Sequence, residues 1–313
     1  MIASNGPGAS DSRYEELPHL TSHDEAFREK FLSWDLGDLT YVDIREYLKQ
    51  KDTILIPMAS LEQHGPHLPL YTDTITAVEI SRRVSEMIAV LHTPPIWTGY
   101  SPQHMHTPEQ GRGTITLRSS TLLNLMHDVA RSLIHHGFNR LIFVNGHGSN
   151  VKVVDPILRK LRYDTGALIS FVKPYMENYV GILDGLMENP WDETPGWHSS
   201  ELETSQDLAW NEKLVRMDRA EFTRAHIPQH LPETFDKKDG MPDVAFEGYK
   251  YFTFPMDHHE FIESGTIGNP LRATKEKGEE AFRRLSEHVA RGVLELMQVE
   301  VEVHNREFVD RVL

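Results

Sequence analysis

Residues 53–73, TILIPMASLEQHGPHLPLYTD, join an apolar run to a segment rich in metal-ligand side chains. The run TILIPM, residues 53–58, is short, apolar and rich in β-branched residues, which predicts a buried strand. Two prolines and a glycine exclude a regular helix over residues 60–73. That segment still contains four carboxylate or imidazole side chains: Glu62, His64, His67 and Asp73. We therefore predict a strand-end loop that faces a crevice.

Strands and helices alternate along the following part of the chain. Apolar residues recur near a helical period from Thr74 onward, which predicts a helix capped by Asp73 or Thr74. The pattern then repeats as helix 121–136 (cap Ser120 or Thr121, stop Gly137), strand 140–144, loop 145–150, helix 151–163 and strand 167–172. This alternation predicts an α/β fold with a mainly parallel sheet.

The remaining segments define the expected domain organisation. Residues 1–30 are interpreted as an N-terminal extension that is partly disordered, because their first dozen residues are rich in Gly, Ser and Pro. Residues 31–313 are expected to form a single domain, with a long amphipathic helix at about 274–298. Residues 229–262 are acidic, aromatic and rich in Pro and Gly, so we expect an insertion loop that acts as a lid or an oligomer contact.

Composition narrows the class of protein. The 313 residues carry a formal net charge of −15, with 47 acidic against 32 basic side chains. Such a surplus argues against nucleic acid or an anionic membrane as the main partner, and says little about a small neutral substrate. Without cysteine, any metal must be held by His, Asp and Glu. The N-terminus lacks signal-peptide features and no apolar run approaches the roughly 18 residues of a membrane span, so we expect a cytoplasmic protein.

Three separated segments supply candidate metal ligands. Glu62 and His64 are two residues apart, so they point the same way in an extended backbone. His147 lies between two glycines in NGHGSN, residues 145–150, where the backbone can approach a ligand closely. The segment WHSSELETS, residues 197–205, adds His198, Glu201 and Glu203. Such a set suits Zn²⁺, Mn²⁺ or Fe²⁺, and one carboxylate can bridge two such ions.

Taken together, SLEQHGPHLPLYTD, NGHGSN and HSSELETS resemble the motifs of the creatininase family of metal-dependent amidohydrolases. A weaker similarity covers SGTIGNPLRATKEKG, residues 264–278. The resemblance implies a three-layer α/β/α sandwich, two divalent metal ions (Zn²⁺ or Mn²⁺, with Fe²⁺ as an alternative), and a homo-oligomer, commonly a hexamer. Carried over by position, it implies five metal ligands: Glu62, His64, Asp73 (bridging), His147 and Glu203.

The same resemblance implies roles for four further residues. His198 matches the motif histidine that would handle protons near the substrate, and Glu201 is the second candidate for that catalytic role. Ser101 and His104 match the start of the family segment S-x-x-H and are expected to bind substrate. Of the other histidines, His67 is interpreted as structural, and His258 and His259 as loop or interface residues.

Two departures from the family pattern bear on the substrate. Creatinine-hydrolysing members carry a ligating glutamate two residues after the NGH histidine, where this chain has Ser149. Residues 100–117 are longer than the family segment and replace its Phe-Pro-Gly. The chain is thus more similar to NGHG members of the family, such as diketo-inositol (3-dehydro-scyllo-inosose) hydrolases.

We therefore predict a hydrolase in which a metal-activated water attacks a carbonyl of a small, polar, cyclic substrate. The ring would open at an amide C–N bond, or at a C–C bond of an oxidised cyclitol. Two alternatives remain open: a metallopeptidase or deformylase that acts on a small modified substrate, and a non-enzymatic protein stabilised by its metal.

Overall fold

A parallel sheet forms the centre of the computed structural model, which describes residues 22–106, 109, 111–173, 181–188, 198–237 and 243–308. The sheet has the strand order β2-β1-β3-β4. Its strands are β1 (Thr53–Met58), β2 (Leu91–His92), β3 (Arg140–Asn145) and β4 (Leu168–Val172). All neighbouring strands in it are parallel. The predicted strand over 53–58 is confirmed, and 140–144 and 167–172 are confirmed to within a residue.

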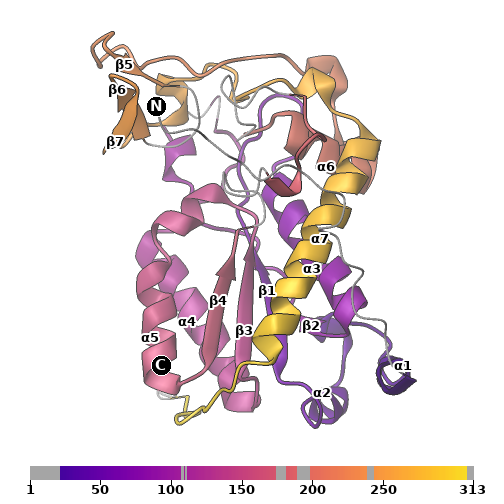
Figure 1. Cartoon of the computed structure of the whole chain (residues 1–313). Coiled ribbons are helices and arrows are strands. Elements are labelled where there is room, and N and C mark those ends of the chain that lie inside the picture. Colours follow the sequence, from indigo (N-terminus) through magenta and orange to yellow (C-terminus); the bar gives the residue numbers. More distant parts are fainter. Residues whose placement is uncertain are drawn as a thin grey trace, which may run out of the picture.

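Helices cover both faces of this sheet, as Figure 1 shows. On one face lie α3 (Thr72–Ile88) and α7 (Lys275–Met297); on the other lie α4 (Ser119–His136) and α5 (Asp155–Thr165). Side chains of β1 alternate between them: Ile54 and Ile56 pack in the core beneath α4 and α5, and Leu55 packs with α3 and α7. The predicted three-layer α/β/α fold is therefore confirmed, because each apolar face of the sheet is buried by its own helical layer.

A further helix, α6 (Glu201–Asn211), packs against α7. Gly278 of α7 makes this contact possible, because a Cβ at that position would lie 1.9 Å from the backbone carbonyl oxygen of Ser205. Two helical backbones can approach this closely only where one of them lacks a side chain. The packing fixes the N-terminus of α6 above the sheet, where Glu203 lies in its first turn.

The chain before the first strand contributes helices α1 (Ser22–Arg28) and α2 (Tyr41–Tyr47). Phe27 is 2 % exposed and packs against Trp34 and Tyr47, with ring centroids 6.3 and 5.9 Å away. The end of the expected extension 1–30 therefore belongs to the hydrophobic core. The expected disorder falls on residues 1–21, which lie outside the described residues.

The segment 229–262 differs from the loop that the sequence predicted. It contains an antiparallel sheet of β5 (Phe235–Asp236), β6 (Asp243–Phe246) and β7 (Tyr249–Thr253). Glu247 and Gly248 both have positive φ, as a two-residue turn between β6 and β7 requires. Beneath this sheet a small core of its own includes Val244, Met256 and Phe261. The loop prediction was wrong because strands this short leave little periodicity in a Pro- and Gly-rich sequence.

Several helix ends also differ from expectation. Helix α3 begins at Thr72 with Tyr71 as its N-cap, which places Asp73 within the first turn. Helix α4 begins at Ser119 and ends at His136, with the predicted stop Gly137 as its C-cap. Where the sequence predicted one helix from residue 151, the chain forms the short 3₁₀ helix η4 (Gly148–Lys152) and then α5. The 3₁₀ helices with bounds among the described residues include η2 (Leu36–Asp38), η3 (Pro102–His104), η4, η6 (Glu212–Leu214), η7 (Met217–Arg219), η8 (His258–Glu260) and η9 (Pro270–Arg272).

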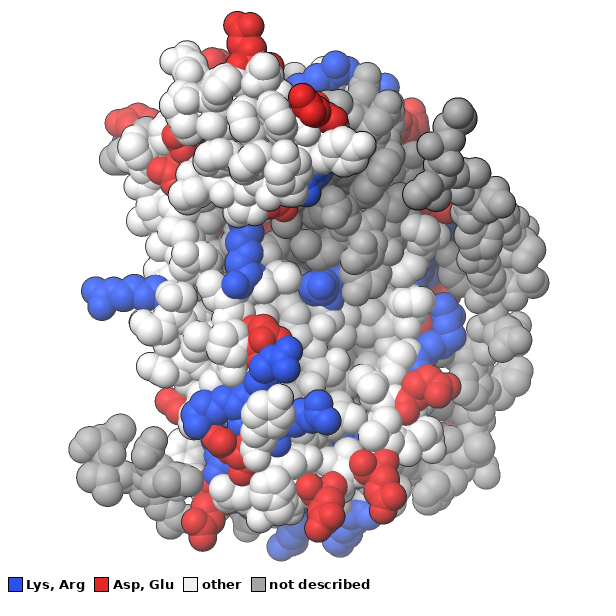
Figure 2. Space-filling view, turned by 60° about the vertical axis from the view of Figure 1, so that its left-hand side comes forward, with Lys and Arg blue, Asp and Glu red and all other residues white. Residues whose placement is uncertain are grey.

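The surface carries both signs of charge. On the face in Figure 2, acidic and basic side chains lie close together in the lower part and are more widely spaced among uncharged residues above it. No helix among the described residues is long and apolar enough to cross a bilayer.

Candidate metal centre

Five predicted ligands meet above the carboxyl edge of the parallel sheet. Glu62 and His64 follow the end of β1, His147 follows β3, and Asp73 and Glu203 lie in the first turns of α3 and α6. Helix N-termini carry a partial positive charge, which favours the two carboxylates there. All five side chains are at least about nine-tenths buried, at 0–5 % exposure.

Gly146 allows two of these segments to cross. A Cβ at this position would lie 2.0 Å from the backbone carbonyl oxygen of Asp73. The loop after β3 therefore passes directly over the first turn of α3, and brings His147 onto the Asp73 carboxylate. The NGH motif thus has a glycine at this position because any side chain would clash with the backbone of α3.

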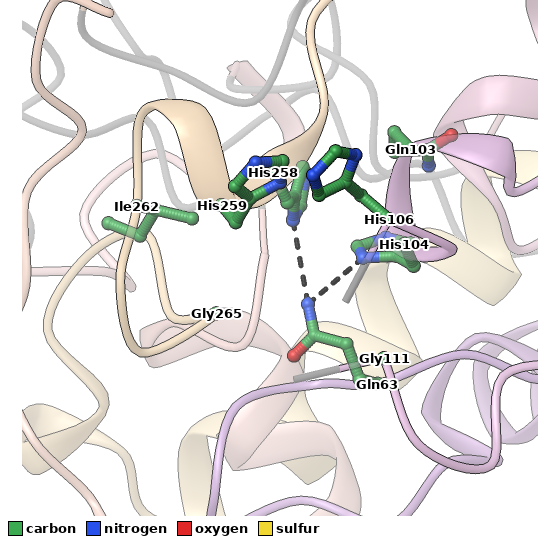
Figure 3. Close-up of a pocket in the computed structure, with 9 residues that line it drawn as sticks. All are labelled: Gln63, Gln103, His104, His106, Gly111, His258, His259, Ile262 and Gly265. Atoms are coloured by element: carbon green, nitrogen blue, oxygen red, sulfur yellow. Dashed lines mark hydrogen bonds between the residues drawn. The ribbon is translucent and has the colours of Figure 1, made fainter. Parts of the chain in front are cut away.

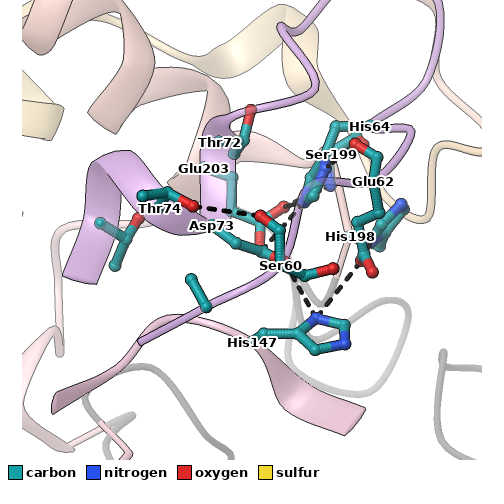
Figure 4. Close-up of polar contacts among 12 residues, drawn as sticks. Ser60, Glu62, His64, Thr72, Asp73, Thr74, His147, His198, Ser199 and Glu203 are labelled. Atoms are coloured by element: carbon teal, nitrogen blue, oxygen red, sulfur yellow. Dashed lines mark hydrogen bonds and ion pairs between the residues drawn. The ribbon is translucent and has the colours of Figure 1, made fainter. Parts of the chain in front are cut away.

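The ligand atoms form two groups that share Asp73, as Figure 4 shows. In the first group, His147 Nδ1 lies 2.9 Å from Asp73 Oδ2 and 3.4 Å from Glu62 Oε1. In the second, His64 Nε2 lies 3.2 Å from Asp73 Oδ1 and 3.7 Å from Glu203 Oε2. Each oxygen of Asp73 therefore faces its own imidazole and its own second carboxylate. A bridging carboxylate between two ions requires this arrangement.

Backbone carbonyls fix the imidazole tautomers. His64 Nδ1 lies 3.1 Å from the Glu62 carbonyl oxygen, and His147 Nε2 lies 3.0 Å from that of Tyr100. Because a carbonyl only accepts, these nitrogens carry the proton. The opposite nitrogens, His64 Nε2 and His147 Nδ1, keep their lone pairs and face the carboxylates. Metal-ligating histidines are oriented in this way.

The chemistry of the cluster fits divalent cations. Three buried atoms that face it have no hydrogen-bond partner among the described residues: Glu62 Oε2, His64 Nε2 and Asp73 Oδ2. Three buried carboxylates and two imidazole lone pairs within a few ångströms are costly to desolvate without a counter-charge. Imidazole and carboxylate donors match Zn²⁺ and Mn²⁺.

Without a cation, the cluster would hold protons instead. Burial raises the pKa of Glu203 to about 8, and repulsion by the Asp73 carboxylate adds to that rise. Burial opposes the charged form of His147, but Glu62 and Asp73 outweigh it and raise the pKa of this imidazole to about 9. At neutral pH these protons neutralise part of the charge that a metal would otherwise balance.

Two further imidazoles lie beside the cluster. His198 Nε2 donates to the carbonyl oxygen of Gln63 at 2.9 Å, which leaves the Nδ1 lone pair 3.9 Å from Glu62 Oε1. Burial, followed by the nearby His64, holds the pKa of His198 well below its ordinary value, so its ring is neutral. His104 Nε2 lies 3.3 Å from the same Glu62 oxygen. The structure thus brings the predicted proton-handling and substrate-binding histidines to one side of the cluster.

Gln63 orients these imidazoles and was not singled out from the sequence. Its Oε1 accepts from the Gly65 backbone N–H at 2.9 Å, which fixes the amide so that Nε2 points toward the histidines. Gln63 Nε2 can donate its two hydrogens to His104 Nδ1 at 3.0 Å and to His258 Nδ1 at 3.5 Å, and the protonated His198 Nε2 lies 3.2 Å away. The nitrogens of these three histidines also lie close enough to hold a metal. The amide donor occupies the space between them, so we assign a hydrogen-bond network there instead.

Residues 37–293 match the Creatininase family model, described as creatinine amidohydrolase. The chain belongs to the creatininase family. It is 30 % identical to the creatinine amidohydrolase of Pseudomonas putida over 78 % of this chain and 90 % of that protein. It is 28 % identical to the 3-dehydro-scyllo-inosose hydrolase of Thermotoga maritima, over 83 % and 82 %. A mycofactocin precursor peptide peptidase of Mycobacterium tuberculosis is also 28 % identical, over 84 % and 92 %.

Solved creatininase structures agree with this assignment. One titled "Creatininase Mn" superposes with a TM-score of 0.67 and 26 % identity, covering 85 % of this chain and all of that chain. A mutant creatininase described as Zn-Zn type gives 0.65 and 27 %, with the same coverage to within 1 %. The predicted family and fold are confirmed, and the chain is a creatininase-family hydrolase. Divalent metal binding is supported by these structures and by the ligand groups described above.

Glu201 is not at the metal centre, contrary to the expectation of a catalytic role. Its carboxylate accepts from Lys277 Nζ at 2.7 Å and from the Glu188 backbone N–H at 2.9 Å. Glu201 and Glu203 both lie on α6, because residues 201–211 form a helix. Two residues on a helix are roughly 200° apart, so Glu201 faces α7 while Glu203 faces the metal centre.

Two serines near the family's metal centre also have contacts that the sequence did not predict. Ser101 is fully buried, and its Oγ lies 2.5 Å from Ser60 Oγ and 3.2 Å from His147 Nε2. It therefore contacts the side chain of one predicted metal ligand, and its predicted role in substrate binding stays a prediction. Ser149, which replaces the ligating glutamate, accepts from Gln103 Nε2 at 3.0 Å. Because Ser149 has no carboxylate, the carboxylate beside His64 comes from Glu203 instead.

A pocket next to the metal centre contains the histidines that the sequence assigned to a loop or interface. It is lined by Gln63, Gln103, His104, His106, Gly111, His258, His259, Ile262 and Gly265, all labelled in Figure 3. His258 is 8 % exposed and packs on His104. The motif DHHE at 257–260 was the only hint in the sequence of these pocket histidines. Its position in the fold depends on the strands before it, which the sequence did not predict.

Proposed function

We propose that this chain is a two-metal hydrolase that opens a small, polar, cyclic substrate at a carbonyl. One ion would be held by Glu62, Asp73 and His147, and the other by His64, Asp73 and Glu203. The division of the two Asp73 oxygens between two separate ligand groups carries this proposal. Each group offers three protein ligands and so leaves positions for water and substrate, whereas a structural site is closed.

The ions would supply Lewis acidity and an activated water. The chain's own residues then handle protons on the side that faces the pocket. His198 Nδ1, neutral and unprotonated beside Glu62, can accept a proton and return it to a leaving group. His104 Nδ1 accepts from Gln63, so its Nε2 carries the proton and can donate to a developing oxyanion.

The cleaved bond is either an amide C–N bond or a C–C bond of an oxidised cyclitol. Similar proteins are named for creatinine amidohydrolysis and for 3-dehydro-scyllo-inosose hydrolysis, which represent these two reactions. Ser149 and the long segment 100–117 favour the cyclitol-type reaction, because both alter the pocket relative to creatinine-hydrolysing members. The active form is proposed to be a cytoplasmic homo-oligomer, with the family hexamer as the expected size.

The test is a substrate panel offered to the protein loaded with Zn²⁺ or Mn²⁺. Creatinine, simple lactams, formamides, 3-dehydro-scyllo-inosose and short peptides are each incubated, and the products are identified by mass spectrometry. Ring opening of a cyclic substrate, lost in the Glu203→Gln variant, supports the proposal. Cleavage of peptides alone would favour the metallopeptidase alternative. An absence of turnover in the fully loaded protein would favour the metal-stabilised, non-enzymatic alternative.

A further inference from the structure

The segment 229–262 places one imidazole against the metal centre from above. His258 belongs to η8, which contacts η3, the short helix that carries His104. The His258 ring lies edge-on to the rings of His104 and His198, with centroids 4.1 and 4.8 Å away. It therefore touches both histidines to which the proposed function gives a role.

A hydrophobic neighbour and an amide hold this ring in place. Phe261 packs edge-on against His258 with centroids 5.2 Å apart, and Phe261 itself is 2 % exposed. Gln63 Nε2 approaches His258 Nδ1 at 3.5 Å, at the long limit of a hydrogen bond. The ring orientation is thus set from both sides, and the described residues provide no partner for Nε2.

The pocket beside His258 is lined mainly by imidazole and amide side chains. The described residues of its lining include four imidazoles and two side-chain amides, and none of them is a carboxylate, lysine or arginine (Figure 3). Burial holds the pKa of His258 well below its ordinary value, so this ring offers one N–H and one lone pair. Groups that both donate and accept match hydroxyls, which also do both, better than they match an anion, which only accepts.

We propose that His258 is a substrate-binding residue, contributed by the 229–262 segment, that hydrogen-bonds a hydroxyl-bearing part of the substrate beside the metal pair. This inference rests on the proposed function and narrows its substrate to a polyhydroxylated ring. It also assigns the segment a role in specificity, because His258 lines the pocket together with the neighbouring His259, which stacks on His106 at 4.0 Å.

The experiment separates the polar atoms of His258 from the packing of its ring. His258→Phe keeps an aromatic ring against His104 and Phe261 but removes both nitrogens, and His258→Gln keeps a donor and an acceptor. His230→Ala is the matched control, because its side chain is 52 % exposed and belongs to the same segment. Metal content and thermal stability are measured first for every variant. Binding of myo-inositol to the zinc-loaded full chain is then followed by ligand-observed NMR, with malonate as the anionic comparison.

The wild type, His230→Ala and His258→Gln are expected to bind myo-inositol. His258→Phe should bind it about tenfold more weakly, as expected for loss of one hydrogen bond, while both ions remain bound. With a turned-over substrate, His258→Phe should raise KM about tenfold and change kcat little. Equal binding by His258→Phe, no inositol binding by the wild type, or preference for malonate would each overturn the inference. Inositol binding without any turnover would leave it standing and count against the proposed function alone.

Discussion

Asp73→Asn should remove both metal ions at once, because each Asp73 oxygen faces a different ligand group. The substitution keeps the shape of the side chain but removes the charge that both ions share. An ion present at 100 times its Kd stabilises the folded protein by about 2.7 kcal/mol, so two ions contribute about 5 kcal/mol. In a protein of this size, that corresponds to a rise in Tm of about 10 °C.

The assay is a thermal denaturation series with and without Zn²⁺, together with metal content by mass spectrometry. The wild type should bind two ions and show the full rise in Tm. Glu203→Gln removes a ligand of only one group, so it should bind one ion and show about half of the rise. Glu201→Gln is the matched control two residues away, and it should bind both ions because Glu201 pairs with Lys277.

The ordering of these variants tests the bridging geometry itself. If Asp73→Asn keeps both ions and the full rise in Tm, the shared-ligand interpretation is wrong. If Glu201→Gln loses an ion while Glu203→Gln does not, the orientation of α6 is wrong.

Three further outcomes are expected. His198→Ala should retain both ions and lower kcat by about 10²–10⁴-fold, measured by steady-state kinetics on a turned-over substrate; loss of an ion would make His198 a ligand. Gly146→Ala should lower the free energy of unfolding by about 1–3 kcal/mol and weaken metal binding, because its Cβ would meet the Asp73 carbonyl, whereas Gly148→Ala has open space and should change neither. Metal binding at pH 7 should release protons, because Glu203 and His147, with pKa values of about 8 and 9, hold protons that their ligand forms lack. Calorimetry in buffers of different ionisation enthalpy measures this proton release. Because protons compete with the metal, metal binding should also become weaker below pH 7. A binding heat that does not depend on the buffer would contradict the prediction.

The convergence of the ligands was predictable because it follows from the topology of the sheet. The run 53–58 and the strand 140–144 are parallel neighbours, so the segments after them meet at one edge. Glu62, His64 and His147 were therefore expected to lie together, and they do. Asp73 could be placed beside them because the helix that follows the loop begins there.

The orientation of side chains on α6 could not be predicted from residues 197–205 alone. Glu201 and Glu203 are both carboxylates in the same motif, and their roles differ only because the backbone is helical. The decisive partner of Glu201, Lys277, is 76 residues away. Local periodicity does not report such a distant contact.

The small sheet of the 229–262 segment lay beyond sequence reasoning for a related reason. Strands of two to five residues carry too short a pattern to distinguish them from a loop. Because β6 and β7 were not predicted, the position of His258 relative to His104 could not be inferred from the sequence. Gln63 was likewise visible in the motif, but its function as a shared donor depends on His104 and His258, which come from separate segments.

The most direct test of the two-metal centre is anomalous X-ray diffraction from crystals of the protein soaked with Zn²⁺ or Mn²⁺. The proposed ligand groups predict two peaks about 3.5–4 Å apart, on either side of the Asp73 carboxylate, with His147 beside one and His64 beside the other. A single peak, or cations bound only elsewhere on the molecule, would contradict the account.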